Sequence, residues 1–80
     1  MSNTTVQPTQ HASSVDIIVN GTPQHAPAHW TVQDLAESLG LTGKRVAIEV
    51  NLAIIPRSRL AFHRLNSGDR VEIVHAIGGG

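Results

Sequence analysis

Alternating apolar and polar residues begin at Val15 and recur in short segments along the rest of the chain. Residues 1–14 consist mainly of Ser, Asn, Thr, Gln and Pro, and such a segment cannot bury enough apolar surface to offset its ordering entropy. We therefore expect residues 1–14 to be a disordered leader or a remnant of an expression vector. Residues 15–77 should form one folded domain, and residues 78–80 a flexible glycine tail.

The first two segments predict a β-hairpin. Residues 15–19 alternate, with a branched aliphatic residue at every second position, which is the pattern of a half-buried strand. Asn20 and Gly21 follow, and both tolerate the positive φ of a type I′ turn. A second strand should return over residues 22 to about 26. Its prolines favour the edge of a sheet, where a missing N–H donor is tolerated.

A helix is expected after Trp30. Thr31 is a suitable N-cap, and Asp34 can complete a variant of the capping box. Trp30 and Leu35 have the spacing of a hydrophobic staple, and Gly40 should end the helix as a left-handed cap. The residues predicted to form the buried face, spaced i, i+3, i+4 and i+7, are Val32, Leu35, Ala36 and Leu39.

Three further strands are expected after the helix. Residues 46–50 alternate again and predict a strand. Residues 52–55 form a short apolar segment that Pro56 stops, and we expect a short strand there. Residues 70–76 should form the last strand, because residues 66–69 give a dense turn signal just before it.

The side-chain directions near the end of the domain follow from the same pattern. Residues 57–64 are expected to be irregular, with at most one helical turn, and to bury Leu60 and Phe62. In the last strand, alternation places Val71 and Ile73 inward. The residues placed outward, unless the register slips by one residue, are Glu72, Val74 and Ala76.

The order of elements predicts the fold class. It reads strand, strand, helix, then two or three strands, and one helix serving one mixed sheet is a two-layer α+β arrangement. A hairpin, a helix and a strand that returns to the centre of the sheet describe a β-grasp, or ubiquitin-like, fold. We expect a mixed sheet of four to five strands packed on one main helix, with no second domain.

The composition excludes several function classes. The chain has 80 residues and no Cys, so it offers no disulfide framework, thiolate zinc site or cysteine nucleophile. Lys plus Arg and Asp plus Glu each number 6, so the positive field typical of a nucleic-acid binder is missing. No apolar run approaches the length of a membrane span, and the N-terminus lacks the features of a signal peptide. We predict a soluble, cytoplasmic protein that binds neither nucleic acid nor membrane.

The histidines predict no metal site and no catalytic set. His25 and His29 are four residues apart, but Pro27 between them argues against a shared helix face. His63 and His75 lie in separate segments, whereas zinc sites draw on Cys or on three or four grouped ligands. No Ser, His and acid set stands in a nucleophile motif. We expect no bound metal or cofactor, and no catalysis by this domain alone.

The chain ends in Ile77-Gly78-Gly79-Gly80. Glycine allows backbone conformations and close approaches that other residues forbid. Three extended residues reach roughly 10 Å. Such a tail can pass through a narrow channel and present the α-carboxylate of Gly80 to a reactive centre on another protein. A frayed terminus is the alternative, because chain ends are often disordered.

A partner-binding surface is expected beside this tail. Val74 and Ala76, the outward residues of the last strand, make a small apolar patch with Ile77, and Arg57 can frame it. On a small domain, an apolar patch with a polar rim often marks a partner site. Single exposed apolar residues are common on any surface, so the patch by itself names no partner.

Several motifs together resemble the ThiS family of sulfur carriers of thiamin biosynthesis. The resemblance covers residues 15–80. Its motifs are, in order, Asn20-Gly21, Thr31-Val32-Gln33-Asp34-Leu35, Val46-Ala47-Ile48-Glu49-Val50-Asn51, Ile55-Pro56-Arg57, Gly68-Asp69-Arg70-Val71-Glu72-Ile73-Val74 and Ala76-Ile77-Gly78-Gly79-Gly80. The small subunit of molybdopterin synthase shares the fold and the terminal Gly-Gly, but it is less similar around Asn51 and Ile55-Pro56-Arg57.

The resemblance implies a role for the C-terminus. In the family, an E1-like ThiF-type adenylyltransferase uses ATP to activate the terminal carboxylate, and a sulfur donor enzyme converts it to a thiocarboxylate. A ThiG-type thiazole synthase then takes the sulfur to build the thiazole of thiamin. Carried over, Gly80 is the covalently modified residue, and Gly78 and Gly79 let the tail thread into partner active sites. This chain is then a carrier, monomeric when free, and not an enzyme.

Two other functions stay open at this point. The chain can carry sulfur for molybdopterin or another pathway, which the identity of its activating and acceptor proteins would decide. It can also be a non-covalent ubiquitin-like interaction module whose glycine tail is incidental. Deleting Gly79 and Gly80 separates the classes, since a pure binding module keeps its affinity for its partner. The sequence does not determine the sulfur donor.

Overall fold

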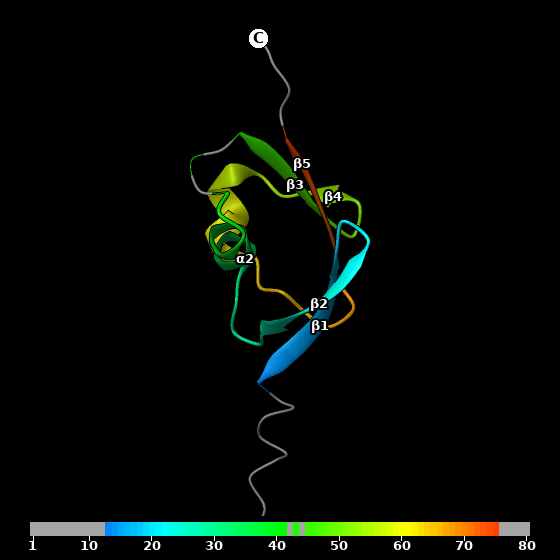
Figure 1. The fold of residues 1–80 in the computed structure, drawn as a ribbon. Coiled ribbons are helices and arrows are strands. Elements are labelled where there is room, and N and C mark those ends of the chain that lie inside the picture. The colour runs from blue at the N-terminus through cyan, green and yellow to red at the C-terminus, as the bar shows by residue number, and fades with distance from the viewer. Residues whose placement is uncertain (1–12, 42, 44, 76–80) are drawn as a thin grey trace, which may run out of the picture.

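A computed structural model describes residues 13–41, 43 and 45–75 of the chain (Figure 1). These residues form one five-stranded mixed sheet in the order β2-β1-β5-β3-β4. The elements are β1 (Ser14–Val19), β2 (Thr22–Pro27), α2 (Val32–Ser38), β3 (Val46–Val50), β4 (Ala53–Ile54), the 3₁₀ helix η1 (Arg57–Phe62) and β5 (Arg70–His75). Both helices lie on the same side of the sheet (Figure 1). The predicted two-layer α+β fold, with four to five strands on one main helix, is confirmed.

The hairpin of β1 and β2 forms as predicted. Asn20 and Gly21 have φ of 49° and 84°, and Val19 pairs with Thr22 across this two-residue turn. Hydrogen-bonded and non-hydrogen-bonded pairs alternate along an antiparallel ladder. The backbone N–H groups of the even-numbered residues of β2 therefore point to β1, and the backbone N positions of the odd-numbered residues point away from it. Pro23 and Pro27 therefore occupy outward positions, where the lack of an N–H leaves little for another strand to pair with. The first strand begins at Ser14, one residue before the predicted boundary, and residues 1–12 lie outside the described residues.

The start of α2 has the predicted capping box. The Thr31 hydroxyl accepts a hydrogen bond from the Asp34 backbone N at 3.2 Å, and Asp34 Oδ2 accepts one from the Thr31 backbone N at 2.9 Å. Two N–H groups that the first turn leaves unpaired are thereby satisfied. Trp30 is half-buried against the core, as expected for the residue that precedes the cap.

At the end of α2, the predicted Gly40 cap is confirmed and the predicted burial of Leu39 is wrong. Gly40 has φ of +75° and donates to the Glu37 carbonyl, while Leu41 donates to the Ala36 carbonyl, both at 3.0 Å. These two bonds make a Schellman motif with Gly40 as its left-handed residue, as predicted. Leu39, which we predicted to be buried, is 41% exposed. It is the C-cap and has left the helical path, so Leu41 packs against the core beyond it.

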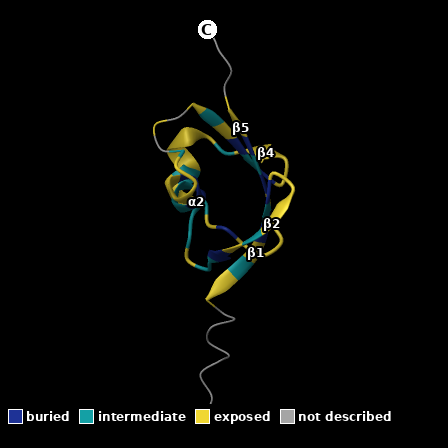
Figure 2. Cartoon of the chain, viewed as in Figure 1, coloured by how far each residue is buried: buried dark blue, intermediate teal, exposed yellow. Residues whose placement is uncertain are grey.

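The core lies between the sheet and α2, and Figure 2 shows buried positions in both layers. Val71 and Ile73 of β5 point into it, as predicted. Phe62, predicted to be buried, is 78% exposed, and Leu65 is 1% exposed in its place. A 3₁₀ helix has three residues per turn, so Leu60 on the inner side of η1 leaves Phe62 on an outer side. The residues that form the core are Ile17, Val19, Ala26, Val32, Leu35, Ala36, Ile48, Val50, Leu65, Val71 and Ile73.

The second tight turn shortens β4. Asn51 and Leu52 have φ of 52° and 72°, and Val50 pairs with Ala53 across them. The predicted strand over residues 52–55 is therefore wrong at its ends, because β4 contains only Ala53 and Ile54. A two-residue turn with both φ values positive takes up the residues before Ala53.

Strand β5 is held at the centre of the sheet by the side chains of both turn asparagines. It pairs with β3 along five residues but with β1 along only two. Asn20 Oδ1 accepts a hydrogen bond from the Ile73 backbone N at 2.7 Å, which continues the short parallel ladder. Asn51 Oδ1 accepts one from the Arg70 backbone N at 3.0 Å. The strand that leads to residues 76–80 is thus fixed from both sides.

Replacing Asn51 with Ala should lower the free energy of unfolding by about 1–3 kcal/mol. The change removes the bond to Arg70, and it leaves Oδ1 of the buried Asp69 without the donor that Asn51 Nδ2 supplies at 3.0 Å. It also places Ala, which lacks the short polar side chain that lets Asn tolerate the left-handed region, at positive φ. Asn51→Gly, which relieves only the backbone strain, should recover a few tenths of a kcal/mol to about 1 kcal/mol. Urea unfolding measures both, and unchanged midpoints would show that these bonds do not stabilise β5.

Candidate partner surface at the end of β5

The described part of β5 ends at His75, and residues 76–77 separate it from the predicted glycine tail. Val74, the last outward residue of the described strand, is 55% exposed, as predicted. It pairs with Ala47 of β3 on the face of the sheet away from α2. The other predicted site residues, Ala76, Ile77, Gly78, Gly79 and Gly80, lie outside the described residues.

The structure brings Arg57 and Val74 together. Arg57 is exposed at the start of η1, and both residues line one shallow hollow of about 230 Å³ at the end of the sheet. The other residues of this hollow are Arg45, Val46, Ala47 and His75. Two of the predicted partner-binding residues therefore share a surface, although 16 residues of chain lie between them.

Arg45 was not predicted as a site residue. It precedes β3, and it lines the same hollow as Val74 and His75 because β3 and β5 are neighbours in the sheet. A basic residue directly before an apolar strand is a common arrangement, so only the strand order distinguishes it. The exposed Arg59, Arg64 and Arg70 do not line this hollow.

The ionisable groups that form contacts within the described residues lie outside this hollow. The ion pair seen in that part of the chain joins His25 Nδ1 to Asp16 Oδ1 at 2.6 Å, on exposed side chains of the β1–β2 hairpin. The described residues contain no group of three or more His, Cys, Asp or Glu arranged to hold a metal ion. The buried Asp69 is used structurally, because its carboxylate accepts bonds from Asn51 Nδ2 at 3.0 Å and from the Asn66 backbone N at 2.8 Å.

A separate observation concerns membranes. Among the residues that the structure describes, no helix has both the length and the apolar character needed to cross a bilayer.

The strand order β2-β1-β5-β3-β4, with a helix between the second and third strands, defines the β-grasp class of ubiquitin-like proteins. The sequence profile of the ThiS family matches residues 17–80. The chain belongs to the ThiS family. The predicted fold and the predicted family are both confirmed.

Relatives and a solved structure agree with this assignment. The sulfur carrier protein ThiS of Escherichia coli (strain K12) is 30% identical over 66 residues, which cover 82% of this chain and all of that protein. The sulfur carrier protein ThiS of Bacillus subtilis (strain 168) is 44% identical over 50 residues, covering 62% and 76% of the two chains. The crystal structure of the thiamine biosynthesis protein ThiS from Geobacter metallireducens superposes with a TM-score of 0.72 at 26% identity, covering 82% and 100%.

A second kind of relative is much longer than this chain. The thiazole synthase of Paramagnetospirillum magneticum (strain ATCC 700264 / AMB-1) is 42% identical over 64 residues. These residues are 80% of this chain but 20% of that protein, so the chain spans about a fifth of its length. The thiazole synthase of Magnetococcus marinus matches over the same share at 39% identity.

Proposed function

We propose that this protein is a sulfur carrier of thiamin biosynthesis that holds sulfur as a thiocarboxylate at the carboxyl group of Gly80. One observation carries the proposal. The ThiS family profile extends over the domain and through the three glycines to Gly80, so the tail belongs to the matched region. Gly78 and Gly79 lack side chains, and they allow the tail to thread through a channel too narrow for other residues.

The proposed chemistry begins with a poor electrophile. An α-carboxyl group has a pKa of about 3.3–3.7, so the Gly80 carboxylate is ionised at neutral pH. An ATP-using, ThiF-type adenylyltransferase converts it to an acyl-adenylate and releases pyrophosphate. A donor enzyme then supplies sulfur at the oxidation level of sulfide, which attacks the carbonyl carbon and displaces AMP, so that a thiocarboxylate remains. The side chains that catalyse these steps belong to the partner enzymes, and this chain supplies the terminus.

The acceptor in this proposal is a ThiG-type thiazole synthase. The occurrence of a related segment within two proteins named thiazole synthase supports this choice, because a carrier and its acceptor benefit from being held together. Val74 and Arg57, with Ala76 and Ile77, form the surface that partners contact beside the tail. A protein that acts through its partners in this way needs no bound cofactor of its own.

Pyrophosphate exchange catalysed by the cognate adenylyltransferase tests the first step. The intact chain should support exchange of labelled pyrophosphate into ATP, and a variant lacking Gly79 and Gly80 should lose it while its circular dichroism spectrum stays unchanged. A non-covalent interaction module would instead keep its partner affinity without the two glycines. Exchange that continues at the normal rate in the truncated variant would contradict the proposal.

Rescue of a bacterium that lacks its own sulfur carrier distinguishes the thiamin pathway from a molybdopterin pathway. The chain should restore growth on medium without thiamin. It should not restore molybdoenzyme activity in a strain that lacks the small subunit of molybdopterin synthase. The reverse outcome would assign it to the other pathway.

A further inference from the structure

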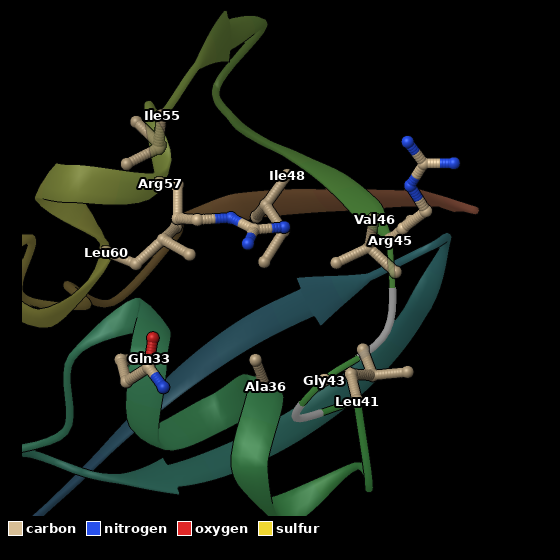
Figure 3. Close-up of a pocket in the computed structure, with 10 residues that line it drawn as sticks. All are labelled: Gln33, Ala36, Leu41, Gly43, Arg45, Val46, Ile48, Ile55, Arg57 and Leu60. Carbon is tan, nitrogen blue, oxygen red and sulfur yellow. The ribbon is translucent and has the colours of Figure 1, made fainter. Parts of the chain in front are cut away.

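A second hollow lies on the helix side of the sheet, between α2, β3 and η1 (Figure 3). It has a volume of about 560 Å³. It exists because the two helices are short: α2 has seven residues and η1 has six, and together they leave the start of β3 uncovered. The residues that line it are Gln33, Ala36, Leu41, Gly43, Arg45, Val46, Ile48, Ile55, Arg57 and Leu60.

The floor of this hollow is apolar. Ile48 of β3 and Ala36 of α2 are core residues at its base. Leu41, Val46 and Leu60 pack against the core, yet they stay half-buried at its sides. Apolar area that a small domain leaves partly exposed inside a concavity is available to an apolar side chain from another molecule.

The rim of the hollow is positively charged. The Arg57 side chain extends across it toward Ile48, and Arg45 lies at the end next to Val46 (Figure 3). No carboxylate is among its described lining residues. Glu37, one turn beyond Gln33 on α2, accepts a hydrogen bond from Gln33 Nε2 at 3.0 Å and does not line the hollow. Neither guanidinium has an ion pair with a described carboxylate, so both are available to an acidic ligand.

The two hollows share lining residues. Arg45, Val46 and Arg57 line both of them, and the smaller one ends at Val74 and His75. We call the two hollows together the arginine groove. Its lining extends from α2, past the start of β3, to Val74 and His75, where the described part of β5 ends.

We infer that the arginine groove docks an acidic segment of the adenylyltransferase that carries at least one large apolar side chain. This inference rests on the proposed function. Carboxylates of the segment pair with Arg45 and Arg57, and its apolar side chain fills the space above Ile48 and Leu60. Residues 76–80 span at most about 17 Å. An enzyme that holds the Gly80 carboxyl group must therefore contact the domain close to His75, where the groove ends.

Charge reversal in the groove tests the inference with the full chain and the cognate adenylyltransferase. We compare Arg45→Glu/Arg57→Glu with the control Arg59→Glu/Arg64→Glu, which makes the same change in net charge at exposed arginines outside the groove. The groove variant should raise KM for the carrier in pyrophosphate exchange by about tenfold or more, with kcat at saturation unchanged. The control should change KM by less than about threefold.

Each outcome has a separate meaning. If the wild-type chain supports no exchange, the proposed function fails. If the wild type is active and both double variants have the same KM, the inference is overturned and the proposed function stands. A raised KM only toward thiazole synthase, or a change in self-association measured by sedimentation, overturns the assignment of the occupant. Arg45→Gln/Arg57→Gln, checked for folding by circular dichroism, should show a smaller rise in KM in the same direction.

Discussion

Replacing Gly79 with Val, or adding one residue after Gly80, is expected to abolish thiocarboxylate formation while the domain stays folded. Val places a branched Cβ where the proposed threading needs none, and it restricts the backbone to fewer conformations. An added residue moves the carboxyl group about 3.3–3.6 Å beyond its reactive position. A shift of that size removes the alignment on which the adenylation step depends.

Intact-protein mass spectrometry measures this effect after incubation with the adenylyltransferase, ATP and a sulfur source. Insertion of one residue between Asn3 and Thr4 is the matched control, because it lengthens the chain equally at the other end. The control should be converted to the same extent as the wild type. Normal conversion of the variant extended beyond Gly80 would show that the terminus is not the site of sulfur transfer.

Truncating Leu65 to Ala should lower the free energy of unfolding by about 2–5 kcal/mol. The side chain is among the largest fully buried ones, and it belongs to the same cluster as Val32 and Val71. Its loss removes apolar contact and leaves a cavity that close packing cannot fill. A domain of this size buries only about 60% of the surface of its unfolded chain, so a loss of this size is a large share of its stability.

Urea unfolding of Leu65→Ala and of the control Phe62→Ala checks this assignment. Phe62 is 78% exposed, and its truncation should change the free energy of unfolding by about 0.5 kcal/mol or less. A greater loss for Phe62→Ala than for Leu65→Ala would mean that the larger aromatic residue is the buried one.

The elements that the sequence predicted well are those whose signals are local. Asn20 and Gly21 supply the positive φ of their turn from two adjacent residues. Thr31 and Asp34 cap the helix from within one turn of chain, and Gly40 ends it. The alternation in β1, β3 and β5 also located the buried face of each strand, because one face of the sheet is covered.

The wrong predictions depend on packing between distant segments. Phe62 is more apolar and larger than its neighbours, and hydrophobicity favoured its burial. The 3₁₀ geometry of η1 turns Leu60 toward the core and Phe62 away from it, and Leu65 is buried in place of Phe62. Leu39 continued the helical period, but the chain had already turned at the C-cap. Leu52 had the apolar character of a strand residue and lies in a turn.

The residues of the candidate site also divide into those that local sequence predicts and those that depend on the fold. Arg57 and Val74 were predicted from their places in the sequence, and in the structure both line one hollow. Arg45 lies beside Val74 through the adjacency of β3 and β5, which no local pattern shows. The glycine tail was predicted from composition and family resemblance. Its role stays a prediction because residues 76–80 lie outside the described part of the chain.

The most direct test of the central claim is the intact mass of this protein purified from cells that actively make thiamin. We predict a population heavier by the difference between one sulfur and one oxygen atom, with fragment ions that place the change at Gly80. Treatment with a thiol-alkylating reagent should shift that population and no other. A single unmodified mass in those cells, with Gly80 intact and no alkylated form, would contradict the proposal that this terminus carries sulfur.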